Sequence, residues 1–173
     1  MSRTTIRPLV LEDATDLAGL YARNREFLRP FEPERDARFF TADGQRMRAA
    51  LAIEEARKGT LFRYVIADSE TQIAGLIGLE NVIRGAAQSA TLSYWVDRAR
   101  NGRGLASQAV ADVAELARTD LGLHRLEAPV RVNNLASQRV LEKNGFERIG
   151  IARGFLHVGG AWRDHILFQR LLH

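Results

Sequence analysis

Apolar residues along the chain switch between the spacing of helices and the spacing of strands, and this switching predicts the order of the elements. Residues 6–9 predict a short strand. Glu12 and Asp13 then begin a helix, which Pro30 and Pro33 end. The apolar face of this helix is formed by Leu17, Leu20, Tyr21 and Phe27.

A second helix is expected over residues 43–57, and Gly59 ends it. Its residues at helical spacing are Met47, Ala50, Leu51 and Glu54. Three strands follow, over residues 61–67, 72–82 and 89–96. A polar turn over residues 68–71 joins the first two, and a looser turn over residues 81–88 precedes the third.

The C-terminal half alternates between helices and strands. The elements are, in order, a helix over 105–118, a strand over 125–132, a helix over 134–144, and strands over 146–152 and 162–171. Gly145 closes the second of these helices, and a loop with Gly159 and Gly160 joins the last two strands. The residues expected to face inward are Leu105, Ala109, Val113, Leu116 and Ala117 in the first helix, and Leu135, Val140 and Leu141 in the second.

This order places three consecutive strands before two strand–helix units, which predicts an α+β protein with a mixed sheet rather than a doubly wound parallel one. The length of 173 residues suggests one domain, and no linker rich in proline, glycine or serine divides the chain. We therefore expect a single domain over residues 1–173.

Composition narrows the class of protein. The chain has no cysteine, which excludes disulfides, zinc–thiolate sites and thiol catalysis and favours a cytoplasmic location. No segment approaches the ~20 apolar residues of a membrane span, and the N-terminus lacks the apolar run of a signal peptide. The formal net charge is +4, but the arginines are scattered, so nucleic acid is not expected as the primary ligand.

Residues 100–106 predict an anion-binding turn between a strand and a helix. Gly102 and Gly104 allow a tight turn and the close approach of a ligand to the backbone. The first amides of a helix lack internal partners and lie at the positive end of its dipole. Arg100 and Arg103 add forked donors suited to phosphate. A solvated turn is the alternative; a Walker A loop and a Gly-x-Gly-x-x-Gly pattern do not fit.

The run Val132 to Phe146 is more specific, because it reads Asn134-x-x-Ser137 followed by Val-Leu-Glu-Lys-Asn-Gly-Phe. Together with the 100–106 turn, it resembles the GNAT acetyltransferase superfamily, in the branch that acetylates the N-termini of proteins, including ribosomal proteins. Residues 24–30 and 162–165 resemble the same branch, so the likeness covers nearly the whole chain. It implies a central, twisted, mostly antiparallel sheet of about seven strands flanked by about four helices.

The resemblance implies that the turn holds the pyrophosphate of acetyl-coenzyme A through main-chain amides. Asn101 departs from the family pattern, where glutamine or arginine is usual. A backbone amide near Trp95 or Val96 would polarise the thioester carbonyl, while the Trp95 ring is expected in the core. The cofactor-binding residues implied are Trp95, Val96, Arg100, Asn101, Gly102, Arg103, Gly104, Leu105, Ala106, Asn134 and Ser137. Asn134 is equally well explained as a helix cap.

Three side chains are candidates for catalysis. The resemblance assigns the leaving thiolate to Ser137, although a serine in a first helical turn also bonds locally. Glu80 ends an apolar strand and could accept a proton from the amine, or it is simply an exposed glutamate. Relatives place a glutamate near position 156, where this chain has none; His157 is the nearby alternative.

The chain is thus predicted to be an enzyme that transfers acetyl from acetyl-CoA to a primary amine, without a metal. A protein or peptide α-amine is the expected acceptor, and a small amine such as an antibiotic, polyamine or amino acid is the alternative. Acidic residues in the acceptor cleft would favour a cationic small molecule, whereas an open groove would favour a peptide. A coenzyme A-binding sensor without catalysis is the third reading. Since relatives of this branch often pair, the resemblance also indicates a homodimer.

Overall fold

The computed structural model of the protein describes residues 5–69 and 72–173. Its α-helices and strands follow the predicted order. The elements are β1 Thr5–Pro8, α1 Ala14–Leu28, α2 Ala42–Lys58, β2 Phe62–Ser69, β3 Gln72–Ile83, β4 Ser89–Val96, α3 Leu105–Thr119, β5 Arg125–Arg131, α4 Leu135–Lys143, β6 Glu147–Val158 and β7 Ala161–Leu171, with short 3-10 turns at Leu11–Asp13, Ala37–Phe40 and Arg98–Arg100. The predicted polar turn at residues 68–71 lies partly outside the described residues.

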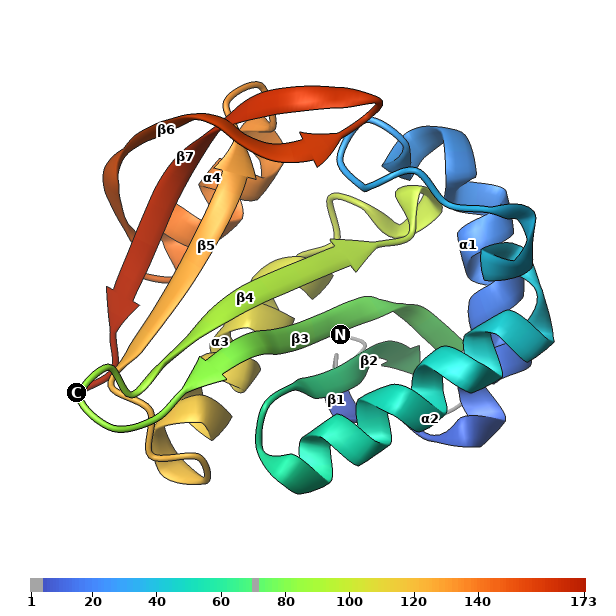
Figure 1. Cartoon of the computed structure of the whole chain (residues 1–173), viewed down its shortest axis with the longest axis horizontal. Helices are drawn as coiled ribbons and strands as arrows, with labels where there is room; N and C mark the ends of the chain where they lie inside the picture. Colours follow the sequence, from blue (N-terminus) through green and yellow to red (C-terminus); the bar gives the residue numbers. More distant parts are fainter. Residues whose placement is uncertain (1–4, 70–71) are drawn as a thin grey trace.

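The strands form one seven-stranded sheet in the order β1-β2-β3-β4-β5-β7-β6. All neighbouring strands are antiparallel except β4 and β5, which run parallel. The sheet and the four α-helices of the described residues confirm the predicted α+β class. The parallel pair is short, because only residues 89–91 of β4 have register partners in β5. Beyond them the two strands diverge, as Figure 1 shows in the middle of the molecule.

Helices cover both faces of the sheet (Figure 1). One core cluster joins α3 and α4 to the sheet, with Val113, Leu126 and Phe168 at its centre. A second cluster joins α1 and α2 to the opposite face and includes Leu20 and Leu76. Successive side chains of a strand point to opposite faces, so these clusters fix which side each strand residue occupies.

The packing face of α2 differs from the expected one. Met47 and Leu51 are 46% and 60% exposed. The helix packs instead through small residues, Gly44, Ala49 and Ala52. The reason is close approach: a Cβ at Gly44 would lie 1.9 Å from the Arg38 carbonyl oxygen.

Two predictions about the C-terminal elements are wrong. Leu135 is 57% exposed rather than inward, whereas Leu141 is fully buried. Six residues of an α-helix turn through about 240°, so these two leucines cannot share a face. The predicted loop after Ala152 is also wrong, since β6 continues to Val158 and meets β7 in a tight turn at Gly159-Gly160.

None of the helices within the described ranges combines the length and the apolar character needed to cross a bilayer.

Candidate active site

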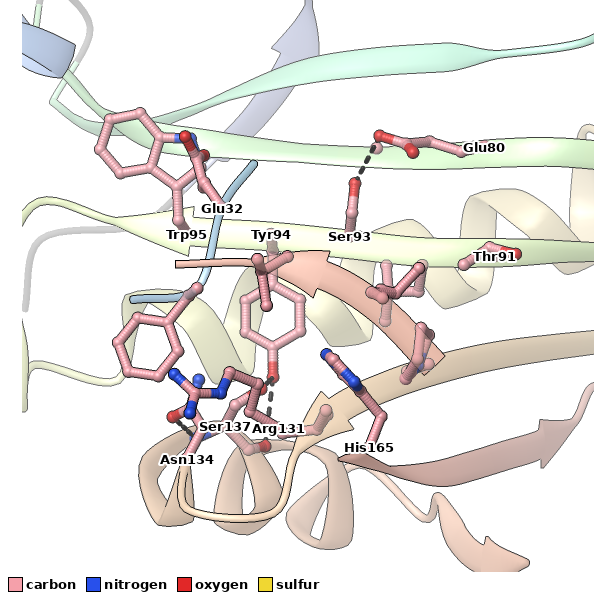
Figure 2. A pocket seen from close by; sticks show the side chains of 18 of the residues that line it. Glu32, Glu80, Thr91, Ser93, Tyr94, Trp95, Arg131, Asn134, Ser137 and His165 are labelled. Carbon is pink, nitrogen blue, oxygen red and sulfur yellow. Dashed lines mark hydrogen bonds between the residues drawn. The ribbon is translucent and has the colours of Figure 1, made fainter. Parts of the chain in front are cut away.

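The divergence of β4 and β5 opens a cleft of about 740 Å³. Its lining comes from β3, β4, β5, α4, the β6–β7 hairpin and the segment after α1. It brings together five predicted site residues that are far apart in the sequence: Glu80, Trp95, Asn134, Ser137 and His157. Figure 2 shows the labelled side chains converging from these elements.

The backbone of β4 presents hydrogen-bonding groups to this gap. In an antiparallel pair, residues bonded to the neighbouring strand alternate with residues facing away. The Asp97 amide donates to the Ala74 carbonyl at 2.7 Å, so by alternation Trp95 also faces β3. Tyr94 and Val96 therefore direct their amides toward the side that β5 has left. Of the two residues predicted to polarise a thioester, Val96 has the suitable orientation and Trp95 does not.

The turn after β4 has the backbone geometry expected of an anion site. Gly102 and Gly104 adopt φ angles of +78° and +81°, which only glycine adopts without strain. Helix α3 starts at Leu105, and the Gln108 amide donates to the Gly104 carbonyl at 3.0 Å. The amides of Leu105, Ala106 and the next residue therefore precede the first intrahelical donor, have no acceptor within the helix and could bind phosphate oxygens.

A buried carboxylate holds this turn against α1. Asp97 accepts hydrogen bonds from Arg23 Nη2 at 2.7 Å and from Asn24 Nδ2 at 3.0 Å. Asn24 Oδ1 in turn accepts from the Arg98 amide at 2.9 Å. Although burial opposes it, hydrogen bonding to Arg23 and Asn24 keeps the pKa of Asp97 below its ordinary value. Asn24 belongs to residues 24–30, which resemble the acetyltransferase branch named above, and its side chain thus fixes the turn.

The arginines of the turn are engaged differently from the expectation. Arg100 donates to Asp68 Oδ2 at 2.8 Å and to the Gln72 side chain, so its terminal nitrogens already have acceptors. These contacts tie the turn to the β2–β3 end of the sheet, and the role of Arg100 toward phosphate stays a prediction. Arg103 is largely exposed and lies 3.7 Å from the same Asp68 oxygen. Asn101 is exposed at the end of the 3-10 turn.

Ser137 and Tyr94 form a hydrogen-bonded pair across the gap between α4 and β4. Their hydroxyl oxygens are 2.8 Å apart, and the Tyr94 hydroxyl also lies 3.2 Å from the Ser137 carbonyl oxygen. Burial raises the pKa of Tyr94 to about 12, so the phenol stays protonated and can donate. Asn134 Oδ1 accepts from the Ser137 amide at 3.2 Å, which confirms the helix cap.

Glu80 is held by its neighbours in the sheet. Its Oε1 atom accepts from Arg63 Nη2 at 2.7 Å and from Ser93 Oγ at 2.9 Å. The second carboxylate oxygen has no hydrogen-bond donor among the described residues. Glu80 therefore stays a candidate acceptor, but one paired with a cation.

Two histidines line the cleft. His157 is exposed, and its ring meets the edge of Trp162 at 5.5 Å between centroids. His165 is only 3% exposed, and its Nδ1 lies 2.9 Å from the Arg163 carbonyl oxygen. The sequence indicated His157 as a candidate catalytic residue. It indicated His165 only as a member of residues 162–165, a segment that resembles the family.

The comparisons with known proteins agree with this geometry. The family described as "Acetyltransferase (GNAT) domain" matches residues 3–147. The chain belongs to the GNAT acetyltransferase family. It is therefore an acyltransferase that moves acetyl from acetyl-CoA to an amine, as the sequence predicted.

Individual relatives cover most of this GNAT chain. It is 39% identical over 161 residues to the Bacillus subtilis (strain 168) protein named "Probable N-acetyltransferase YjcK", which spans 92% of this chain and 89% of the relative. The ribosomal-protein-S5-alanine acetyltransferase of Vibrio fischeri has a TM-score of 0.94 at 30% identity, covering 99% of this chain and 94% of that one. Mycobacterium smegmatis RimJ, in complex with CoA-disulfide, has a TM-score of 0.93 at 33% identity, covering 97% and 81%.

The GNAT cleft continues into a second cavity of about 520 Å³, between the segment after α1 and the β6–β7 turn. These segments touch, since the Gly159 amide donates to the Glu32 carbonyl at 3.0 Å, and the red hairpin tip meets the blue segment in Figure 1. Arg131 Nη1 donates to the Pro30 carbonyl at 2.7 Å. The charged residues of this cavity are Arg25, Arg29, Arg35, Arg131 and Arg163, with Glu32 and Glu34.

Aromatic side chains separate the two cavities from the α1–α2 core. Trp95 donates from Nε1 to the Tyr21 hydroxyl at 3.1 Å, and the two rings lie 4.6 Å apart. The Trp95 ring, expected in the core, is partly buried: it packs against the α1–α2 core and also lines the cleft. Glu32 lines both cavities, and burial raises the pKa of its carboxyl group.

Proposed function

We propose that this GNAT enzyme acetylates the N-terminal α-amine of a protein or peptide, using one domain that spans residues 1–173. The choice of acceptor rests on the charge of two spaces, the cleft and the second cavity that extends it. Arginines outnumber glutamates in the cleft, four to three, and in the second cavity, five to two.

An arginine-rich lining disfavours a cationic small molecule such as a polyamine. It also favours the neutral form of an entering amine, because nearby positive charge opposes protonation. An α-amine, with a reference pKa of about 8, reaches that form more readily than a lysine side chain at about 10.4. The cleft and the second cavity are continuous and together suit an extended peptide. The acceptor named for the Vibrio fischeri relative, an alanine of ribosomal protein S5, supports the same assignment.

For the cofactor, we propose that the turn at residues 101–106 holds the pyrophosphate and that the Val96 amide donates to the thioester carbonyl. The helix start at Leu105 supplies open amides, and the splayed strands leave room for the pantetheine arm beside β4. The complex of Mycobacterium smegmatis RimJ with CoA-disulfide supports coenzyme A as the ligand. Arg100 contributes by fixing the turn.

For the leaving group, we propose that Ser137 hydrogen-bonds to the departing thiolate and passes it a proton. The hydroxyl oxygens of Tyr94 and Ser137 are 2.8 Å apart, and with Tyr94 as the donor of this hydrogen bond the serine proton is left to point into the cleft. Neither hydroxyl is a strong acid, so a hydrogen bond that strengthens as charge develops on sulfur is the main contribution.

Thiol release from acetyl-CoA, followed across a panel of acceptors, tests the proposed function. The panel contains peptides with free and blocked N-termini, peptides with an internal lysine, and spermidine. We expect turnover only with free N-termini. Faster turnover with spermidine, or equal turnover with N-terminally blocked lysine peptides, would contradict the assignment.

We also propose that the enzyme acts in the cytoplasm as a homodimer. A cysteine-free chain suits a reducing compartment, and the ribosomal acceptor named for a relative supports the same location. Strand β6 ends the described sheet and exposes Ile149 and Ile151, at 56% and 59%. An apolar edge strand of this kind supports pairing between copies.

A further inference from the structure

We propose that His165 is the general base that removes the proton from the attacking amine. The inference rests on the proposed function for its substrate, since it needs an amine in the cleft. It was not visible in the sequence, where His165 is one residue of a strand.

The hydrogen bond at Nδ1 fixes the tautomer of the imidazole. The partner of Nδ1 is the carbonyl oxygen of Arg163, at 2.9 Å, and a carbonyl oxygen can only accept. Nδ1 therefore carries the proton, and in the neutral ring Nε2 carries the lone pair. The ring is also held by Phe155, 5.9 Å away between centroids. The structure thus presents one oriented acceptor atom, as a general base requires.

The imidazole points into the cleft. Figure 2 shows the His165 ring directed from β7 toward β4, across the space that the cleft occupies. His165 is among the residues that line the cleft, and its hydrogen bond within the described chain is made by Nδ1, which leaves Nε2 available. A water molecule or an amine can therefore reach it.

His165 also lies on the correct side of the sheet. Val130 and Ile166 are cross-strand partners and face the α3–α4 core. The adjacent pair, Arg131 and His165, must then face the opposite side, with Trp95. Ser137 comes from α4, which lies on the α3–α4 side of the sheet. A thioester in the gap would have its leaving sulfur near Ser137 and would receive the amine from the side of His165.

The other candidate bases are less well arranged. One oxygen of Glu80 is paired with Arg63. His157 is exposed and packs on the edge of Trp162. Glu32 lines both cavities, but its carboxylate lies 3.8 Å from Arg35 and is paired with that cation. Only His165 joins burial, a fixed tautomer and a position facing β4.

The proton balance of the step is closed. The ammonium form of the acceptor first gives one proton to His165 Nε2, which returns it to solvent; this is the net proton that the reaction releases. The neutral amine then attacks the carbonyl carbon, forming the C–N bond. Nε2 takes the second N–H proton as the C–S bond breaks, and the thiolate receives one proton through Ser137. That second proton leaves His165 to solvent and replaces the one lost by Ser137.

The decisive variant is His165→Asn, because the asparagine amide can still donate to the Arg163 carbonyl while the distal nitrogen is removed. With the best acceptor peptide, we expect kcat to fall about 10²–10⁴-fold, the range of general base catalysis. The dissociation constant of acetyl-CoA and the melting temperature should stay near those of the wild type. In His165→Ala, added imidazole should restore part of the turnover. His124→Asn, a change at an exposed histidine outside both cavities, should match the wild type.

Three results would overturn the proposal: wild-type turnover in His165→Asn, loss of acetyl-CoA affinity in proportion to the loss of turnover, or no rescue of His165→Ala by imidazole. A separate outcome concerns the acceptor. If wild-type enzyme acetylates a small amine and no peptide, the proposed function fails, and the same variants measured with that amine still decide the role of His165.

Discussion

Gly104 has the most demanding backbone of the cofactor turn, with φ at +81° immediately before α3. We expect Gly104→Glu to abolish acetyl-CoA binding. A non-glycine residue at this angle costs roughly 1–2 kcal/mol, and the carboxylate adds negative charge where the pyrophosphate would lie. A Cβ at this position meets no atom within 4 Å, so the fold should persist. Isothermal titration with coenzyme A measures the effect.

Gly59 provides a matched control for this substitution. Its φ is +75°, and a Cβ there also meets no atom within 4 Å, but it ends α2 and lines neither cavity. Gly59→Glu should lose similar stability and keep full coenzyme affinity. Equal affinities in the two variants would remove the turn from the cofactor site.

The hydroxyl of Tyr94 matters only through Ser137. We expect Tyr94→Phe to lower kcat about tenfold, which corresponds to the ~1.4 kcal/mol of one well-placed hydrogen bond. Ser137→Ala should lower it further, and the double variant should be no worse than Ser137→Ala alone. Steady-state kinetics of the three variants check this. Additive losses would show that the two hydroxyls act independently.

Some of these residues could be found from the sequence and others could not. Asn134 and Ser137 belong to one short motif, and their relation is a local helix cap. Tyr94 contacts Ser137 across 43 residues, and in the strand pattern it resembles any core aromatic. The tautomer of His165 depends on a carbonyl oxygen, which no side-chain pattern encodes.

At the scale of elements, the cofactor turn depends on α1 through Asp97. Because the pKa of Asp97 is lowered in the folded protein, its carboxylate stabilises the fold at pH values above the unfolded pKa of about 3.9. This contribution is lost as the pH falls through the lower pKa of the folded state. We expect Asp97→Asn to reduce the free energy of unfolding by about 1–3 kcal/mol at pH 7. The difference from wild type should shrink below about pH 4.

Urea unfolding at pH 7 and pH 3 measures this difference. Arg57→Gln is the control, since Arg57 pairs with Glu54 on an exposed helix surface at 3.3 Å and should change stability little. A difference between wild type and Asp97→Asn that is the same at both pH values would show that the ionised carboxylate does not stabilise the fold.

The elements themselves were predictable where one periodicity ran unbroken. Strand β4 has the predicted ends, Ser89 and Val96, because polar and apolar residues alternate regularly along most of it. Strand β6 was predicted too short, since its pairing with β7 is irregular between Ala152 and Leu156 and its exposed residues break the alternation. The packing face of α2 was missed because small residues, not its large apolar ones, approach α1.

Over the whole molecule, the positive lining of the acceptor side should select among peptides. We expect peptides with an acidic residue shortly after the N-terminus to have about tenfold higher kcat/KM than the same peptides with lysine there. The arginines of the second cavity supply the attraction, and salt should weaken it. Arg163→Gln should reduce the preference while leaving the turnover of a neutral peptide unchanged. No preference at low salt would contradict this prediction.

The proposed homodimer depends on the outer edge of the sheet. We expect Ile151→Lys to give a monomer, because a charge at an apolar edge strand opposes pairing. Light scattering after size exclusion measures the mass, with Met47→Lys, on the exposed face of α2, as the control. A wild type that is monomeric at all concentrations would contradict the proposed dimer.

The short ladder between β4 and β5 has a consequence for how this enzyme could change over time. On the proposed placement, the acetyl donor is bound by amide groups that every residue except proline possesses. A substitution at such a position alters the shape of the cleft wall without deleting the donor. Substitutions in the residues that select the acceptor can then accumulate while the donor chemistry is unchanged. Proline is the replacement at Val96 that would delete the amide donor itself.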